Sequence, residues 1–281
     1  MAVAVVTDSS TGLPTELVAA LGIKVVPLHV RVGARELREG VDDMPADLAH
    51  RSVTTSAASP GELQAAYEQA AHGADGVVAV HLSRYLSGTF DAARTAAAAT
   101  AGPVRVVDSA SAGMGTGFGA LAAARVAHGG GTVEEVTAAA VRVAERARCL
   151  LVVDRLEQLR RGGRISTAAT IFGTGLVSRP LLQLVDGRLV LKEKARTASK
   201  VLAKLSDTAT RLAGTGGAAV AVQHLDAPER AAELGRALQE RVPLLDEFVV
   251  TEFGPTLGVH LGSGALGAVV VPGGAGVVHM G

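Results

Sequence analysis

The sequence is poor in the residues that several common kinds of site require. It has one cysteine, Cys149, so a single chain can form neither a disulfide framework nor a multi-cysteine zinc site. Aromatic residues make up 2% and tryptophan is missing, which argues against a platform for stacked nucleic-acid bases. Lysine plus arginine number 27, as do aspartate plus glutamate, so no basic surplus is available for a nucleic-acid backbone.

Long uninterrupted apolar runs are also absent. The first eight residues contain no basic region, and their apolar run is too short for a secretory signal. The uncharged stretch from Phe253 to Met280 is broken by glycines, prolines and His260, which predicts strands and a flexible tail rather than a membrane span. We therefore expect a cytoplasmic protein. Cys149 begins an apolar run, which favours a buried thiol over a nucleophile.

The chain is rich in β-type runs that alternate with alanine-rich helical stretches, and 48% of its residues are apolar. The first half predicts strands at Ala2–Val6, Lys24–Val32, Gly76–His81 and Val104–Val107, and helices at Pro14–Ala20, Pro60–Ala71, Gly88–Ala99 and Gly117–Ala127. Ser59 and Glu62 form a capping signal for the second helix. This order predicts an α/β fold whose parallel sheet carries helices on both faces, with ligands at the carboxyl ends of the strands.

A second α/β unit is predicted after a glycine-rich break and a helix at Val133–Arg146. We place the boundary between an N-terminal domain, residues 1–148, and a C-terminal domain, residues 149–281. The second unit predicts a strand at Cys149–Val153, a hairpin of Leu181–Val185 and Arg188–Glu193 that turns at Asp186-Gly187, a helix at Ala198–Ala213 and a βαβ stretch from Ala218 to Val250.

Hydroxyl side chains gather at two predicted connections from strand to helix. Thr54-Thr55-Ser56 precedes the helix that begins at Pro60, and Ser87-Gly88-Thr89 begins the next helix. Helix N-termini attract anions, although a serine or threonine there is more often only a cap. Because both clusters occupy neighbouring connections of one predicted sheet, together they favour a site for one carboxylate or phosphate.

Other motifs leave alternatives open. His260 lies among glycines, which is compatible with a carboxylate site or with a core histidine. The basic loop 160–164 is typical of a solvated surface or of an electrostatic docking patch. Gly115–Ala120 fits the dinucleotide pattern G-x-G-x-x-A, but no acidic residue ends a following strand, so helix packing is favoured. The histidines show no metal-ligand spacing, and no metal is expected.

Several short motifs occur along the chain in a fixed order, and each is weak alone. They are Thr7-Asp8-Ser9-Ser10, Thr54-Thr55-Ser56 with Ser59 to Glu62, Leu86-Ser87-Gly88-Thr89-Phe90, Val107-Asp108-Ser109, Leu156 to Ser166, and Gly254-Pro255 with Gly258 to Ala265. The ordered set resembles the DegV family of bacterial lipid-binding proteins, which includes the fatty-acid-binding subunits of bacterial fatty acid kinase. The resemblance extends to about Val271, and its most specific part is Leu156 to Ser166.

The resemblance implies a two-domain DegV-like fold with one long-chain fatty acid in a tunnel between the domains. Its carboxylate would be held by Thr55 and Ser87. The surrounding head-group shell would comprise Ser56, Gly88, Thr89 and His260. The resemblance also implies that a separate kinase subunit transfers phosphate from ATP to the bound carboxylate, with Arg196 as the candidate docking residue. No catalytic residue and no cofactor are expected in this chain.

A second function stays open at this stage. Ser87, His260 and either Asp8 or Asp108 are the residue types of a serine hydrolase triad, which would cleave acyl esters. No G-x-S-x-G nucleophile elbow is present. The sequence therefore favours a fatty acid carrier over a hydrolase or a nucleotide-binding oxidoreductase.

Overall fold

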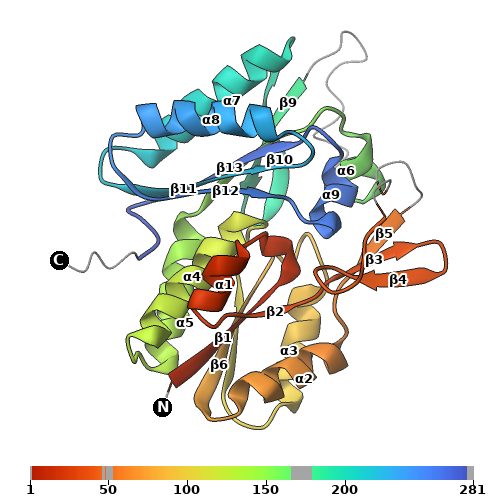
Figure 1. Ribbon diagram of the computed structural model, residues 1–281, viewed down its shortest axis with the longest axis vertical. Coiled ribbons are helices and arrows are strands. Elements are labelled where there is room, and N and C mark those ends of the chain that lie inside the picture. The colour runs from red at the N-terminus through yellow and green to blue at the C-terminus, as the bar shows by residue number, and fades with distance from the viewer. Residues whose placement is uncertain (1, 46–47, 49–52, 166–178, 277–281) are drawn as a thin grey trace.

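Layers of helices and sheets alternate through the molecule in the computed structural model, which describes residues 2–45, 48, 53–165 and 179–276 (Figure 1). One layer is a four-stranded parallel sheet in the order β2-β1-β6-β7. Its strands are β1 (Ala2–Asp8), β2 (Lys24–Val26), β6 (Ala74–His81) and β7 (Val104–Asp108). The predicted α/β fold with a parallel sheet and helices on both faces is confirmed.

The second large sheet has six strands in the order β10-β9-β8-β13-β11-β12. These are β8 (Arg148–Val152), β9 (Arg179–Val185), β10 (Arg188–Ala195), β11 (Ala218–His224), β12 (Leu245–Glu252) and β13 (Leu266–Pro272). Only β11 and β12 run parallel, as the predicted βαβ stretch requires, and the other neighbouring strands pair antiparallel. Asp186 and Gly187 turn the β9–β10 hairpin with positive φ angles, as predicted.

Helices cover both faces of each of these sheets (Figure 1). The first sheet carries α2 (Pro60–Ala71) and α3 (Thr89–Ala99) on its outer face, and the second carries α7 (Ala198–Ala213) and α8 (Pro228–Arg241). Between the sheets lie α4 (Met114–His128) and α5 (Val133–Arg146). Gly115–Ala120 lies within α4, where all of its residues are buried, so the small residues serve helix packing.

One continuous apolar core joins the two sheets through α4 and α5. It includes Val5 of β1, Phe118 of α4, Val136 of α5 and Val269 of β13. Cys149 belongs to the same core and is buried, as predicted. This core extends across the predicted boundary between residues 148 and 149, so the two units share buried surface rather than only a linker.

A small antiparallel sheet corrects two predictions. It is formed by β3 (His29–Val32), β4 (Arg35–Arg38) and β5 (Val53–Ser56), in the order β4-β3-β5. The single predicted strand Lys24–Val32 is divided at Pro27, which has no N–H to donate to a ladder. Thr54-Thr55-Ser56 was predicted to lie at a helix N-terminus, but it belongs to β5, and Ser59 caps α2 in the predicted capping box.

Short helices complete the fold. They are η1 (Ser9–Thr11), α1 (Thr15–Ala20), α6 (Glu157–Arg161) and α9 (Pro255–Leu261). The stretch Phe253–Met280, predicted as strands and a tail, contains α9 as well as β13, so the helix was missed there. Ser166 and the end of that stretch, residues 277–280, lie outside the described residues. Within the described part of the chain, no helix is long and apolar enough to cross a bilayer.

Candidate functional site

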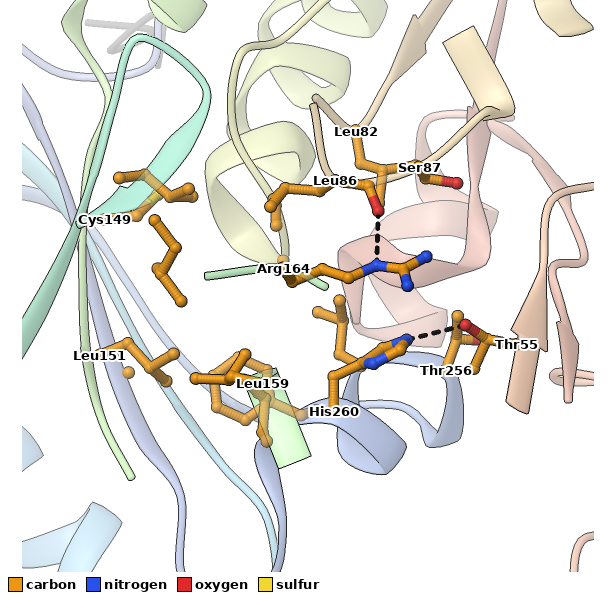
Figure 2. A pocket seen from close by; sticks show the side chains of 18 of the residues that line it. Thr55, Leu82, Leu86, Ser87, Cys149, Leu151, Leu159, Arg164, Thr256 and His260 are labelled. Atoms are coloured by element: carbon orange, nitrogen blue, oxygen red, sulfur yellow. Dashed lines mark hydrogen bonds between the residues drawn. The ribbon is translucent and has the colours of Figure 1, made fainter. Parts of the chain in front are cut away.

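A cavity of about 350 Å³ lies between the small antiparallel sheet, the loop after β6 and the inner face of the six-stranded sheet. Its volume falls in the range of roughly 300–1,000 Å³ that small-molecule sites occupy. Most of its wall is apolar, and the larger aliphatic and aromatic lining residues are Leu28, Leu82, Leu86, Leu150, Leu151, Leu159, Leu184, Leu189, Phe253, Leu257, Leu261 and Val269. Polar side chains gather on one side of it (Figure 2).

Thr55 and His260 meet at the polar end of the cavity. Thr55 is on β5 and His260 is on the last turn of α9, yet the threonine Oγ1 lies 2.8 Å from the histidine Nε2. Burial, and to a smaller extent the positive charge of Arg164, lower the pKa of the His260 imidazole to about 4. Near neutral pH the ring is therefore uncharged and can accept or donate one hydrogen bond at Nε2.

Arg164 brings a positive charge into the same end of the cavity. Its Nε donates to the carbonyl oxygen of Leu86 at 3.0 Å, and its Nη1 donates to the carbonyl oxygen of Gly162. Burial lowers the pKa of its guanidinium, which nevertheless stays charged in proteins. Among the described residues, no carboxylate forms an ion pair with Arg164. A half-buried guanidinium without a carboxylate favours an anionic ligand.

The positions of Arg164 and His260 depend on each other through a glycine. Gly162 ends α6, and a Cβ built on it would lie 2.4 Å from Nδ1 of His260. Only a residue without a side chain lets α6 and α9 approach so closely. This contact explains why a Gly-Gly-Arg sequence follows α6, because the glycine admits His260 and the arginine then turns into the cavity (Figure 2).

Ser87 lies in the loop between β6 and α3 and lines the cavity together with Gly88. Its Oγ lies 2.8 Å from Oγ1 of Thr89 and accepts a hydrogen bond from the Thr89 N–H at 3.3 Å. Thr89 itself is fully buried and supports Ser87 from behind the cavity wall. Because a hydroxyl has one donor and two lone pairs, Ser87 can still donate to a ligand oxygen while it accepts from the Thr89 N–H.

The opposite side of the cavity lies against the six-stranded sheet (Figure 2). Cys149 of β8 lines it there, with its Sγ 2.9 Å from Oγ of Ser111. Burial raises the pKa of the Cys149 thiol, so the group is neutral and apolar in character. Gln223 of β11 also contributes to the wall, but its amide is bound to backbone atoms of Met114 and Thr11. This side of the cavity therefore suits an apolar part of a ligand better than a charged group.

The hydrolase triad is not assembled in this geometry. His260 bonds to Thr55 and Ser87 bonds to Thr89. Asp8 is fully buried and its carboxylate contacts His81, while Asp108 accepts from Arg84. Neither carboxylate therefore orients His260. A serine nucleophile needs a base within hydrogen-bond reach that is itself held by a third group, and these contacts show no such chain.

Comparison with known proteins shows the family. The model of the family described as "Uncharacterised protein, DegV family" matches residues 2–273. The chain belongs to the DegV family. A DegV domain-containing protein of Mycobacterium tuberculosis is 46% identical over 272 residues, which cover 96% of this chain and 97% of the relative. One of Streptomyces coelicolor is 46% identical over 274 residues, covering 95% and 98%.

Solved DegV structures have the same fold. A structure described as "Fatty Acid Binding of a DegV family Protein from Thermus thermophilus" matches with a TM-score of 0.91 and 30% identity, covering 97% of this chain and 100% of that one. The structure of DegV from Bacillus subtilis, described as a fatty acid binding protein, matches with a TM-score of 0.86 and 32% identity, covering 96% and 99%.

The head-group residues that the DegV resemblance implied converge on one cavity. Thr55, Ser56, Ser87, Gly88 and His260 line it. Ser87 and Gly88 lie at the N-terminus of α3, as predicted, whereas Thr55 and Ser56 come from strand β5 and His260 from α9. Arg196 lies apart from the cavity, exposed in the turn between β10 and α7.

Arg164 was missed as a cavity residue by the sequence reasoning. It was assigned to a basic loop that is either solvated or a docking patch, because a run of arginines is usually exposed. The signal that could have separated it from Arg160 and Arg161 is its place after two glycines in the most specific DegV motif. Those glycines allow the chain to turn inward at Arg164.

Proposed function

We propose that this chain binds one long-chain fatty acid, with the acyl tail in the apolar cavity and the carboxylate at Thr55 and Ser87. The observation that carries the proposal is the polarity of the cavity, which is aliphatic over most of its wall and has two hydroxyls, His260 and Arg164 at one end. DegV proteins of known structure that are described as fatty-acid-binding support the assignment.

The energetics favour such a ligand over a shorter acid. A fully buried 16-carbon tail contributes about 12 kcal/mol before the costs of binding, at ~0.8 kcal/mol per CH₂. The carboxylate can be buried only with donors, and Thr55 and Ser87 supply two. Arg164 adds a complementary charge at the same end of the cavity while its Nε stays on the Leu86 carbonyl.

Mass spectrometry of the purified protein tests the proposal. The native spectrum should show one bound ligand per chain, and solvent extraction should release a long-chain fatty acid. Protein that carries no lipid and also takes up no added palmitate would contradict it. Steady release of alcohol from an added acyl ester, lost in Ser87→Ala, would instead support the hydrolase.

Removing either head-group hydroxyl should weaken binding. Thr55→Ala and Ser87→Ala should each cost about 1–3 kcal/mol, a factor of roughly 5–150 in Kd, because each leaves a buried charged acceptor short of a donor. Titration of the lipid-free variants with a fluorescent fatty acid measures this. Thr54→Ala is the matched control, since Thr54 is exposed on β5 and points away from Thr55. Unchanged affinity in both site variants would remove the assignment.

We further propose that the bound carboxylate is presented to a separate ATP-dependent kinase subunit, which forms an acyl phosphate. This chain would then act as a carrier without catalytic activity of its own. In-line attack on a phosphate needs an accessible carboxylate oxygen, and a site built on hydroxyls leaves one free. Exposed Arg196, away from the cavity, is the proposed docking residue.

Arg196→Ala should separate docking from lipid binding. Palmitate affinity should stay at the parent value, while phosphorylation of bound palmitate by the kinase subunit should fall roughly tenfold or more, as for loss of a charged contact at a protein interface. Lys200→Ala, an exposed cation in the first turn of α7, should leave both unchanged. Equal kinase rates for Arg196→Ala and the parent would discard the docking role.

A further inference from the structure

Glu39 is a buried carboxylate that the site described above does not use. It directly follows β4, and only 5% of its surface is exposed. Its Oε2 accepts from Oγ of Ser9 at 2.5 Å and from Oγ1 of Thr256 at 2.6 Å, and its Oε1 accepts from the Thr256 N–H at 3.1 Å. A carboxylate buried to this degree persists only where such donors hold it.

The Thr256 contacts place Glu39 at the beginning of α9. The N-cap residue of that helix is Gly254, which has no side chain to satisfy the first N–H groups. Glu39, in the turn after β4, supplies that acceptor, and its carboxylate faces the positive end of the helix. A Cβ on Gly254 would lie 2.0 Å from Oε1 of Glu39, so the glycine is what admits the carboxylate.

The same carboxylate reaches two walls of the cavity. On one side it holds α9, which carries the lining residues Leu257 and His260. On the other side Ser9, while donating to Glu39, accepts from the N–H of Leu28, another lining residue, at 2.9 Å. The Glu39 N–H also donates to the Leu28 carbonyl at 2.8 Å.

The interaction with Glu39 makes the Thr256 hydroxyl unavailable to a ligand in the cavity. It lines the cavity next to Thr55, as Figure 2 shows, and would be a third hydroxyl donor for a ligand there. Its hydroxyl is instead committed to Glu39. The Thr256 hydroxyl is therefore not available to a head group beside Thr55 and Ser87.

We propose that Glu39 is a positioning residue that caps α9 from the small sheet, holds His260 against Thr55, and thereby keeps the cavity closed around its ligand. This inference depends on the proposed function only because it takes a fatty acid as the ligand. The position of α9 is a property of the lipid-free protein. Loss of the cap frees α9 to move away from β5, which exposes His260 and opens the wall of the cavity.

Two readouts on the same variants test the role. Glu39→Ala and Thr256→Val remove opposite partners of the interaction, and Glu39→Gln keeps the shape without the charge. Protein loaded with palmitate and mixed with phosphatidylcholine vesicles should release it roughly tenfold faster in the first two variants, the scale expected for loss of a helix cap. Glu39→Gln should fall between them and the parent.

The second readout follows the His260 ring in lipid-free protein by NMR titration. In Glu39→Ala and Thr256→Val the pKa of His260 should rise from about 4 toward its ordinary value, because the burial that lowers it is lost. A role in overall stability alone would leave the pKa of this ring unchanged in the folded protein. The charge of Arg164 also lowers the pKa of His260, and Arg164 is unchanged in every variant.

Two variants serve as controls. Thr256→Ser keeps the hydroxyl and should match the parent. Asp42→Asn neutralises a half-buried acid shortly after Glu39 that pairs with Arg38 rather than with α9. Release and titration at parent values in folded Glu39→Ala and Thr256→Val would overturn the inference. If the parent binds no palmitate, the proposed function fails, while the His260 titration still decides the role of Glu39.

Discussion

Asp8→Ala is expected to destabilise the protein by about 3–5 kcal/mol, because it removes the acceptor of several buried hydrogen bonds. Asp8 ends β1, and its side chain and that of His81 are both fully buried. Its Oδ1 accepts from the N–H and Oγ of Ser10, and its Oδ2 accepts from the Leu82 N–H at 3.1 Å. Alanine leaves all of these donors without an acceptor.

The contacts of His81 extend this network and define its proton positions. His81 Nδ1 lies 2.9 Å from Oδ2 of Asp8, and Nε2 lies 2.8 Å from the Tyr67 hydroxyl. Burial, and then the charge of Asp8, raise the pKa of Tyr67, so the phenol keeps its proton and donates it to Nε2. The Nδ1 proton is thereby assigned to the bond with Asp8. The network fixes Leu82, where the loop that carries Ser87 begins.

Urea unfolding measures the expected loss. Asp108→Ala is the matched control, because Asp108 ends strand β7 of the same sheet and accepts from Arg84, whose side chain is 45% exposed. Because Arg84 remains in contact with solvent, loss of that pair should cost only about 1 kcal/mol. Asp8→Asn, which keeps the shape, should lie between the two aspartate-to-alanine variants. Equal losses for Asp8→Ala and Asp108→Ala would show that the buried network contributes little.

Much of the scaffold was predictable because its signals are local. Alternation of β-type runs and alanine-rich stretches predicted β1, β6 and the helices between them, and their positions are confirmed. The capping box of Ser59 and Glu62 and the turn at Asp186-Gly187 are short patterns with one geometric solution each, and both occur as predicted.

The small antiparallel sheet was not predictable in the same way. Arg35–Arg38 offers one apolar residue among charges, so β4 shows no apolar alternation. Thr55 pairs with Val30, and this pairing is set by distant chain rather than by its own neighbours. Its hydroxyl cluster was therefore assigned to the helix that follows. Thr55 lines the cavity, although it lies on a strand and not at the helix N-terminus that was predicted for it.

The positions of two charged residues, one in the cavity and one beside it, were hidden by their tertiary surroundings. Arg164 and Glu39 are residue types that are exposed in most proteins, but here Arg164 is half-buried and Glu39 is buried, each in contact with a distant part of the chain. The sequence around Arg164 does not reveal its bond to the carbonyl oxygen of Leu86, and the sequence around Glu39 does not reveal its bond to the N-terminus of α9. Such placements follow only once α6 and α9 are packed against each other.

His260 should make the lipid-free protein sensitive to acid. Its pKa is about 4 in the folded protein, against about 6.5 in an unfolded chain. The contribution of the neutral ring to stability is complete above pH 6.5. As the pH falls below 6.5, His260 becomes protonated in the unfolded chain but stays neutral in the folded protein, so stability is lost. The loss ends near pH 4, where His260 is protonated in the folded protein as well.

The expected loss over this window is about 3 kcal/mol, since one pKa unit corresponds to 1.36 kcal/mol. Urea unfolding of the parent and of His260→Gln at several pH values between 7 and 4 isolates it as the difference between their stability curves. His128→Gln, at an exposed position at the end of α4, should keep the parent's dependence. Parallel curves for His260→Gln and the parent would contradict the burial of a neutral ring.

A bound carboxylate should reverse the shift. Burial lowers the pKa of His260 most, and the charge of Arg164 lowers it further. A fatty acid carboxylate between these residues would offset the guanidinium charge and accept a hydrogen bond from the protonated ring, so the pKa should rise. NMR titration of His260 with and without palmitate measures this sign. A lower pKa in the loaded protein would place the carboxylate away from Thr55 and His260.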